Sequence, residues 1–386
     1  MFSLLLAIIY ISFISLGLPD SLLGSAWPVM HQDIGAPLSV AGVITMVIAG
    51  GTIISSLFSA KIINRVGTGV VTAVSVFMTA VALFGFSVSD SVLSLCLWGI
   101  PYGLGAGCVD SALNNYVALH YAARHMSWLH CFWGVGCSIS PYIMSFCLTR
   151  GYGWDKGYLS VSILQVVLCT AIFISLPLWK KPEKAEGEEK VKTKSIAQTL
   201  KIKGVVFAIL TFFAYCSLEA TAGLWATSYF VEVRGINEYT AAKFASLFYL
   251  GITFGRFING FLSEKLSDKA LVRIGSGIIL AGIIFVFISF IAPAFALAGL
   301  LIIGLGCAPV YPCLIHSTPI SFGKENSQSV IGLEMATAYV GTTFMPPLFG
   351  ILGDNISLAI FPAFLLFFAL LMVAVSELLN STNKAK

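Results

Sequence analysis

The sequence predicts an all-α integral membrane protein with twelve transmembrane helices in two pseudo-symmetric bundles of six. Three observations predict this fold: the composition, the length of the apolar stretches and an internal repeat. Of the 386 residues, 58% are hydrophobic and 10% are charged, and the mean hydropathy is +0.92. An ordinary soluble domain has about 25% charged residues, so this chain has too few to cover its surface in water. We therefore expect lipid to be its solvent.

Long apolar stretches recur along the whole chain, and about 20 such residues cross a bilayer as a helix. The first residues, MFSLLLAIIYISFISLGLPD, lack the basic start and the cleavage site of a signal peptide, so we expect the first membrane helix there. The predicted spans are residues 4–30, 38–60, 68–88, 92–120, 127–149, 157–179, 204–232, 239–262, 270–291, 294–316, 328–350 and 356–379.

A charged segment divides the chain into two halves. Lysine and glutamate dominate residues 180–203, which predicts a solvated cytoplasmic linker between an N-terminal bundle, residues 1–179, and a C-terminal bundle, residues 204–386. Most other positive charges, such as Lys61 and Arg124, fall in alternate connections. By the positive-inside rule these connections face the cytoplasm, so we expect a multi-pass protein of the plasma (inner) membrane with both termini cytoplasmic.

Several functional classes are disfavoured by composition and motifs. The net charge of +4 does not indicate nucleic-acid binding, because the lysines of the linker are mixed with glutamates. The nine cysteines lie in apolar segments without a CxxC pair, which predicts packing roles rather than a metal site. We also find no phosphate-binding loop and no nucleophile motif, so neither a cofactor nor an enzyme activity is expected. We expect a monomer.

The two halves match at an offset of about 200 residues. This pattern indicates two six-helix bundles related by an axis along the membrane normal, with a cavity between them near the midplane. The matches pair Asp20 and Gly24 with Glu219 and Gly223, residues 55–65 with 255–265, Gly103 and Gly105 with Gly304 and Gly306, and Gly136 and Pro141 with Gly341 and Pro346.

Four segments resemble a known family. Residues 60–67 (AKIINRVG) resemble the cytoplasmic signature of the major facilitator superfamily, with Asn64 where the family has an aspartate, followed by Arg65 and Gly67. Residues 19–23 (PDSLL), 108–117 (CVDSALNNYV) and, less well, 129–136 (LHCFWGVG) resemble stretches of the fucose permease group of sugar:proton symporters. The resemblance covers essentially the whole chain. It implies the major facilitator fold, alternating access, and a cytoplasmic gate motif at Asn64, Arg65 and Gly67.

Two acidic residues in the N-terminal spans are candidates for ion coupling. An ionisable side chain costs about 2.5 to 3.5 kcal/mol at the centre of a membrane helix, so it is seldom kept without a partner or a water-filled cavity. Asp20 and Asp110 lie on helices that border the central cavity in the resembling family. A carboxyl group that alternates between dry and wet surroundings can take up a proton on one side and release it on the other. The alternative is that both carboxylates hold helices together.

Polar and aromatic side chains near these acids suit a sugar. Asn114 shares a helix face with Asp110, and Asn115 follows it. Amides both donate to and accept from hydroxyl groups, although they can equally join helices. His130 could bind substrate or relay a proton, or make a contact between helices, and Trp133 can stack on the apolar face of a sugar ring.

The C-terminal half supplies the other predicted substrate residues. Glu219 and Glu334 lie inside spans, and the repeat would place them across the cavity from Asp20 and His130. Trp225 and Trp27 are further candidates for stacking, and an interfacial role is the alternative for Trp27. His316 is expected at a helix end.

These residues favour a secondary transporter that moves a small polar solute, and the resemblance implies a sugar, coupled to protons or sodium. A proton-driven exporter of drugs or metabolites would use the same acidic residues. A membrane sensor without transport is a third possibility, but the linker is too short for a signalling domain.

Overall fold

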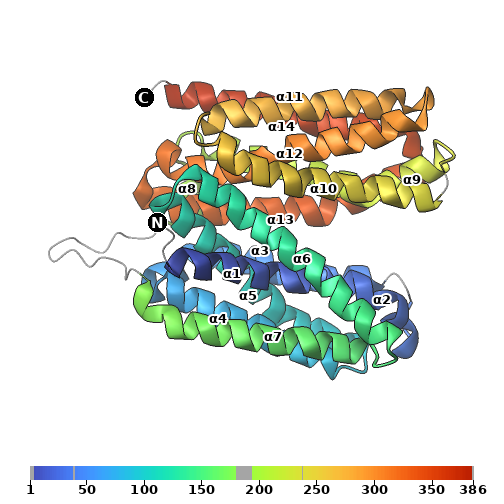
Figure 1. Ribbon diagram of the computed structural model, residues 1–386. Helices are drawn as coiled ribbons and strands as arrows, with labels where there is room; N and C mark the ends of the chain where they lie inside the picture. Colours follow the sequence, from blue (N-terminus) through green and yellow to red (C-terminus); the bar gives the residue numbers. More distant parts are fainter. Residues whose placement is uncertain (1–3, 38–39, 180–193, 237, 385–386) are drawn as a thin grey trace. The chain divides into compact units, whose positions relative to one another are not determined.

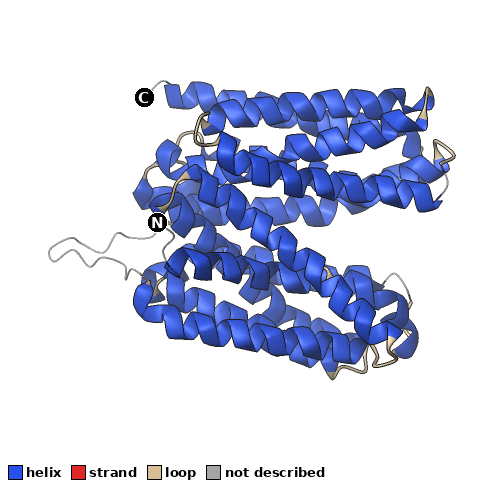
Figure 2. Cartoon of the chain, viewed as in Figure 1, coloured by secondary structure: helices blue, strands red, loops and turns tan. Residues whose placement is uncertain are grey.

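The structure, a computed structural model, describes residues 4–37, 40–179, 194–236 and 238–384. These residues form helices joined by short turns, and the described ranges contain no strand (Figure 2). The chain divides into two compact units, one of Met1–Tyr116 with Leu129–Lys194 and one of Val117–Trp128 with Ser195–Lys386. Most of the predicted linker, residues 180–193, lies outside the described residues.

The first unit contains most of the helices drawn from blue to green in Figure 1, of which α4 and α7 pack closely together. These helices are α1 (Leu4–Asp20), α2 (Leu22–Asp33), α3 (Val40–Val66), α4 (Thr68–Ser87), α5 (Val92–His120), α6 (Ala123–Thr149), α7 (Trp154–Ser175) and the 3-10 turn η1 (Leu176–Leu178). The end of α5 and the start of α6 are grouped with the second unit.

The second unit contains the remaining helices, in which α12 packs against α10 and α11, and α9 packs against α13 and α14. These helices are α8 (Ile196–Leu200), α9 (Val205–Glu232), α10 (Glu238–Leu262), α11 (Asp268–Phe287), η2 (Ile288–Phe290), α12 (Pro293–Phe322), α13 (Lys324–Asn355), η3 (Leu358–Ile360) and α14 (Phe361–Lys384).

The helices are long enough to cross a bilayer. Among the described residues, 11 helical segments have the length and apolar composition of a membrane span, with α1 and the start of α2 counted together as Leu4–Trp27. Leu247–Leu262 of α10 is a shorter apolar stretch. Each of the twelve predicted spans coincides with one of these helices, so the predicted fold is confirmed. The short α8 was not predicted; a capping box of Ser195 and Gln198 begins it.

The first membrane helix is interrupted between α1 and α2, next to Asp20. Pro19 has no N–H to donate to the carbonyl of Ser15, one turn earlier. Gln165 of α7 donates its side-chain amide to that carbonyl, and the Ser15 hydroxyl donates to Gln165 Oε1 at 2.6 Å. Gln165 is fully buried. The freed backbone group is thereby satisfied inside the protein, as a helix in lipid requires.

A second proline, Pro141 in α6, frees the carbonyl of Cys137 in the same way. Ser21, which lies at the interruption of the first membrane helix, donates its hydroxyl to this carbonyl at 2.7 Å. Ser21 Oγ also lies 2.7 Å from Ser140 Oγ. The irregular segment around Asp20 is therefore fastened to α6.

Glycines of the repeat occupy equivalent contacts in the two units. A Cβ on Gly136 of α6 would collide with the backbone of α1, and one on Gly341 of α13 would collide with the backbone of α9. Gly103 of α5 lies against α3 in the same manner as Gly304 of α12 lies against α10. Glycine permits these close backbone approaches.

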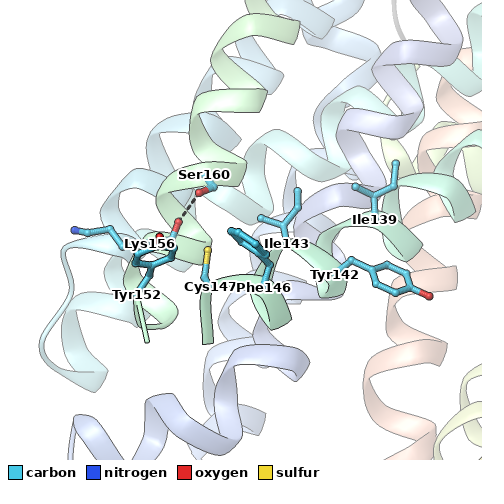
Figure 3. A pocket seen from close by; sticks show the side chains of 8 residues that line it. All are labelled: Ile139, Tyr142, Ile143, Phe146, Cys147, Tyr152, Lys156 and Ser160. Carbon is cyan, nitrogen blue, oxygen red and sulfur yellow. Dashed lines mark hydrogen bonds between the residues drawn. The ribbon is translucent and has the colours of Figure 1, made fainter. Parts of the chain in front are cut away.

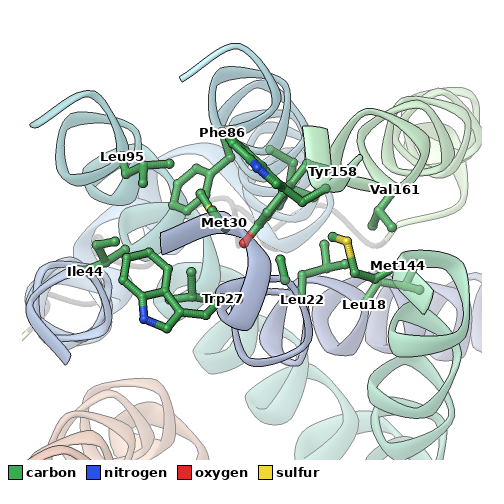
Figure 4. Packing of buried hydrophobic residues seen from close by; sticks show 14 of the residues in the cluster. Leu18, Leu22, Trp27, Met30, Ile44, Phe86, Leu95, Met144, Tyr158 and Val161 are labelled. Carbon is green, nitrogen blue, oxygen red and sulfur yellow. The ribbon is translucent and has the colours of Figure 1, made fainter. Parts of the chain in front are cut away.

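A cluster of buried apolar residues surrounds α2 in the first unit (Figure 4). Trp27 belongs to this cluster together with Leu22, Met30, Phe86 and Tyr158. Only 4% of Trp27 is exposed. Its indole is therefore packed among side chains of its own unit.

Candidate functional site

Asp20 accepts two hydrogen bonds from neutral aromatic side chains. Tyr102 of α5 donates its hydroxyl to Oδ1 at 3.0 Å, and Trp133 of α6 donates Nε1–H to Oδ2 at 2.9 Å. Asp20 itself is exposed. No described basic side chain forms an ion pair with it, so the carboxyl group has lone pairs to offer to a ligand or a proton.

Asp110, Asn114 and His130 form a buried polar chain in the same unit. Asn114 donates its side-chain amide to Asp110 Oδ1 at 2.7 Å, and its Oδ1 lies 3.1 Å from His130 Nε2. An amide oxygen can only accept, so His130 Nε2 carries the hydrogen and donates. Their exposed fractions are 4%, 0% and 6%, respectively. Phe13 of α1 packs edge-on against the His130 ring, with centroids 5.3 Å apart.

Five of the residues predicted from the sequence thus fall into two small networks of the first unit, Asp20 with Trp133 and Asp110 with Asn114 and His130. Asn115 is buried, with 8% exposed. Tyr102 was not predicted, since no sequence pattern links it to a residue on another helix.

Glu219 in the second unit is paired with a cation that the sequence analysis did not name. Arg256 Nη2 of α10 lies 3.5 Å from Glu219 Oε1 of α9. The Arg256 side chain is 6% exposed and that of Glu219 is 23% exposed. Tyr215, one turn before Glu219, donates its hydroxyl to the Cys307 carbonyl of α12 at 3.0 Å. A buried arginine matched by one glutamate leaves this part of the unit nearly neutral.

Glu334 and Trp225 lie elsewhere in the second unit. Glu334 of α13 is 1% exposed, and its two carboxyl oxygens lie 3.1 and 3.0 Å from Thr318 Oγ1 of α12. Trp225 donates Nε1–H to the carbonyl of Pro346 at 2.8 Å and packs against Phe349. Glu334 thus joins α13 to α12, and Trp225 joins α9 to α13.

The predicted cytoplasmic motif lies at the junction of α3 and α4. Asn64 and Arg65 are exposed. Gly67 precedes α4 with φ of 88°, a conformation that favours glycine. His316, which was expected at a helix end, lies in α12, where its Nδ1 is 2.7 Å from Asp268 Oδ2 at the start of α11.

An open pocket of about 660 Å³ lies between α6 and α7 of the first unit (Figure 3). Ile139, Ile143 and Phe146 form its apolar wall, and Lys156 and Ser160 lie at its polar end. None of the predicted site residues lines it. The two hydrogen-bonded networks, and not this pocket, therefore remain the candidate site.

Comparisons with known proteins agree with this architecture. A family model described as the Major Facilitator Superfamily matches residues 9–333. The chain is 25% identical to the glucose/mannose transporter GlcP of Bacillus subtilis, over 70% of this chain and 68% of that protein. It is 21% identical to bypass of stop codon protein 6 of Saccharomyces cerevisiae, over 91% and 77% of the two chains.

A solved structure shares the fold over nearly the whole chain. The structure of FucP, the E. coli fucose:proton symporter, in its outward conformation has a TM-score of 0.77 to this chain at 14% identity, and covers 97% of this chain and 98% of its own. At this identity the likeness concerns the fold. Since the family model matches residues 9–333, the chain belongs to the major facilitator superfamily and is a multi-pass membrane transporter that resembles the fucose permease group.

Proposed function

We propose that this transporter moves a neutral sugar, or a closely related polyhydroxylated solute, together with protons. The observation that carries the proposal is the pair of networks in the first unit. Asp20 with Tyr102 and Trp133, and Asp110 with Asn114 and His130, are carboxylates surrounded by neutral hydrogen-bonding groups within otherwise apolar helices.

The chemistry of the Asp20 network suits a sugar. A hydroxyl group both donates and accepts, and the exposed Asp20 carboxylate accepts while the neighbouring Tyr102 hydroxyl can do either. The Trp133 ring adds an apolar face of the kind on which sugar rings stack. In the second unit, Arg256 is balanced by Glu219, which favours an uncharged solute over an anionic one.

Proton coupling follows from the two carboxyl groups. Asp20 is exposed and can exchange a proton with water, whereas Asp110 is buried and connected to His130 through Asn114. A proton bound at either carboxyl removes a charge whose burial is costly, so occupancy by a proton favours conformations that exclude water. We propose that Asp20 and Asp110 bind the coupled proton and that Asn114 and His130 position it.

The cellular setting is proposed from the charge distribution. The basic residues Arg65, which is exposed, and Arg124, which is half-buried, belong to connections assigned to the cytoplasm by the positive-inside rule. We propose a plasma (inner) membrane location, cytoplasmic termini and a monomeric transporter.

Counterflow in proteoliposomes tests this function. Purified protein is reconstituted with internal unlabelled sugar, and entry of labelled glucose, mannose, fucose or xylose is measured beside a charged sugar acid. We expect exchange of at least one neutral sugar. The Asp110→Asn variant should retain exchange but lose accumulation driven by a proton gradient, because the amide cannot take up and release a proton. The exposed Asp90→Asn variant is the matched control and should accumulate normally. Full proton-driven accumulation by both Asp20→Asn and Asp110→Asn would contradict the proposal.

A further inference from the structure

The second unit contains a buried carboxyl group that has a single side-chain partner among the described residues. Glu334 of α13 is 1% exposed, and so is Thr318 of α12. Thr318 Oγ1 lies 3.1 and 3.0 Å from the two carboxyl oxygens of Glu334. The same hydroxyl oxygen lies 3.1 Å from the carbonyl oxygen of Leu314, one turn earlier in α12.

Thr318 can keep a full hydrogen bond to the Leu314 carbonyl and share a second one with Glu334 only if Glu334 carries a proton. A threonine hydroxyl has one hydrogen to donate and two lone pairs with which to accept. If Thr318 donates to the Leu314 carbonyl, its lone pairs face the carboxyl oxygens of Glu334. A protonated carboxyl group then donates to Thr318, and the chain runs from Glu334 through Thr318 to Leu314. An ionised carboxylate would compete with Leu314 for the single hydrogen.

Among the residues that the structure describes, no ion pair involves Glu334. Helix α13 packs against α9, α12, α14, α8 and η3, and the last two contain no charged residue. On α13 itself, Lys324 lies ten residues before Glu334, about 15 Å along the helix.

Most charged and phenolic side chains of α9, α12 and α14 that the structure describes contact other residues, and Glu232 lies at the far end of α9 from Lys324. Those with described partners are Glu219 with Arg256, Tyr215 with Cys307, Tyr229 with Arg234, Tyr311 with Met335, His316 with Asp268, and Glu377 with Arg273. An ionised carboxylate buried without a counter-charge is strongly unfavourable.

The first unit offers an internal comparison. His130 and Asn114 join α6 to α5 at a separation of 16 residues, and Glu334 and Thr318 join α13 to α12 at the same separation. In the first unit every donor in the chain from His130 to Asp110 finds an acceptor without an added proton. In the second unit, the contact of Glu334 with Thr318 leaves the Thr318 hydroxyl free to donate to Leu314 only when the acid is protonated.

We propose that Glu334 is a second proton-binding site of the transport cycle, protonated in this conformation through its contact with Thr318 and ionised in another. This inference rests on the proposed function, in that it adds a proton site to a proton-coupled transporter. It assigns the proton to a unit different from the one that holds Asp20 and Asp110. Release of the proton leaves Glu334 able only to accept, so the Thr318 hydroxyl must then divide its one hydrogen between Glu334 and the Leu314 carbonyl.

Infrared spectroscopy of the purified protein tests the protonated state without requiring transport. A protonated carboxylic acid has a carbonyl stretching band that a carboxylate and an amide lack. We expect part of this band in the wild type at neutral pH to be absent from Glu334→Gln and present in Glu325→Gln, a matched change at an exposed acid of the same helix. Identical spectra of the two variants in this region would overturn the proposal.

A second variant tests the same contact if Glu334→Gln does not fold. Thr318→Val retains the acid and removes the hydroxyl that accepts a hydrogen bond from it. We expect the carbonyl band of Glu334 to shift to higher frequency in this variant, because a carboxyl group that donates no hydrogen bond has a stiffer carbonyl. An unchanged band would contradict the contact on which the inference depends.

Transport then separates this inference from the proposed function. Glu334→Gln holds the neutral form permanently, so we expect retained sugar binding and loss of most proton-driven uptake, while Glu325→Gln transports normally. Proton-driven uptake by Glu334→Gln equal to that of the wild type would overturn the role of Glu334 alone. Absence of sugar exchange in the wild type would instead refute the proposed function and leave the infrared result standing.

Discussion

Gln165 donates its side-chain amide to the carbonyl of Ser15, which Pro19 leaves without its helical partner. The contact joins α7 to the end of α1, directly before Asp20. It explains how the first membrane helix can be interrupted at an acidic residue without leaving a backbone group unpaired in the interior.

We predict that Gln165→Leu destabilises the protein by about 1 to 3 kcal/mol, because the Ser15 carbonyl loses the side-chain donor that replaces its helical partner. Thermal unfolding in detergent measures the effect. Thr170→Val on the exposed face of the same helix removes a hydroxyl bonded within α7 and should change stability by less than about 0.5 kcal/mol. Equal melting temperatures for the two variants would show that the Gln165 contact contributes nothing.

We predict that Ser21→Ala destabilises the protein by about 1 kcal/mol, because it removes the hydroxyl that donates to the Cys137 carbonyl. Pro141 leaves this carbonyl without its helical donor. Alanine at position 141 restores a backbone N–H that can bond this carbonyl. In a Pro141→Ala background, the loss caused by Ser21→Ala should therefore be smaller by at least about 0.5 kcal/mol. Additive effects in the four-protein cycle would rule out the link.

We predict that Gly17→Ala destabilises the protein by about 1 to 3 kcal/mol, because the added methyl group would collide with the Trp133 carbonyl where α1 meets α6. Gly24→Ala is the control, since no atom lies within 4 Å of its Cβ position. This control should be neutral or gain up to about 1 kcal/mol from helix propensity. A destabilised Gly24→Ala beside an unchanged Gly17→Ala would contradict the packing described here.

We predict that Tyr102→Phe weakens sugar binding by about 2- to 13-fold, the equivalent of one hydrogen bond of 0.5 to 1.5 kcal/mol. The phenol donates to Asp20, and its loss leaves the carboxylate less firmly oriented for a ligand. Ligand-induced thermal shifts give the affinity. Tyr142→Phe, at a side chain of α6 that is 78% exposed, should bind as the wild type does. Unaltered affinity in Tyr102→Phe would exclude this residue from the site.

The twelve spans and the repeat could be predicted from the sequence because both depend on local composition and spacing. Long apolar runs between charged connections mark the spans, and the glycines at an offset of about 200 residues mark the close contacts that recur in both units. These signals do not require knowledge of how each helix is rotated.

The partners of the acidic residues could not be predicted, because helices that are apolar on most sides give no periodic pattern that identifies the inward face. Tyr102 and Thr318 are recognised only once α5 and α12 are placed beside their neighbours. Arg256 is different. It lies inside a predicted span and could have been named on the same ground as Glu219.

The most direct test of coupled sugar and proton transport is the pH of a lightly buffered suspension of proteoliposomes when sugar is added. We predict that the medium becomes more alkaline on addition of a transported sugar to wild-type vesicles, and that this change is absent from Asp110→Asn vesicles that still exchange the sugar. Sugar entry into wild-type vesicles without any change of external pH would contradict proton coupling.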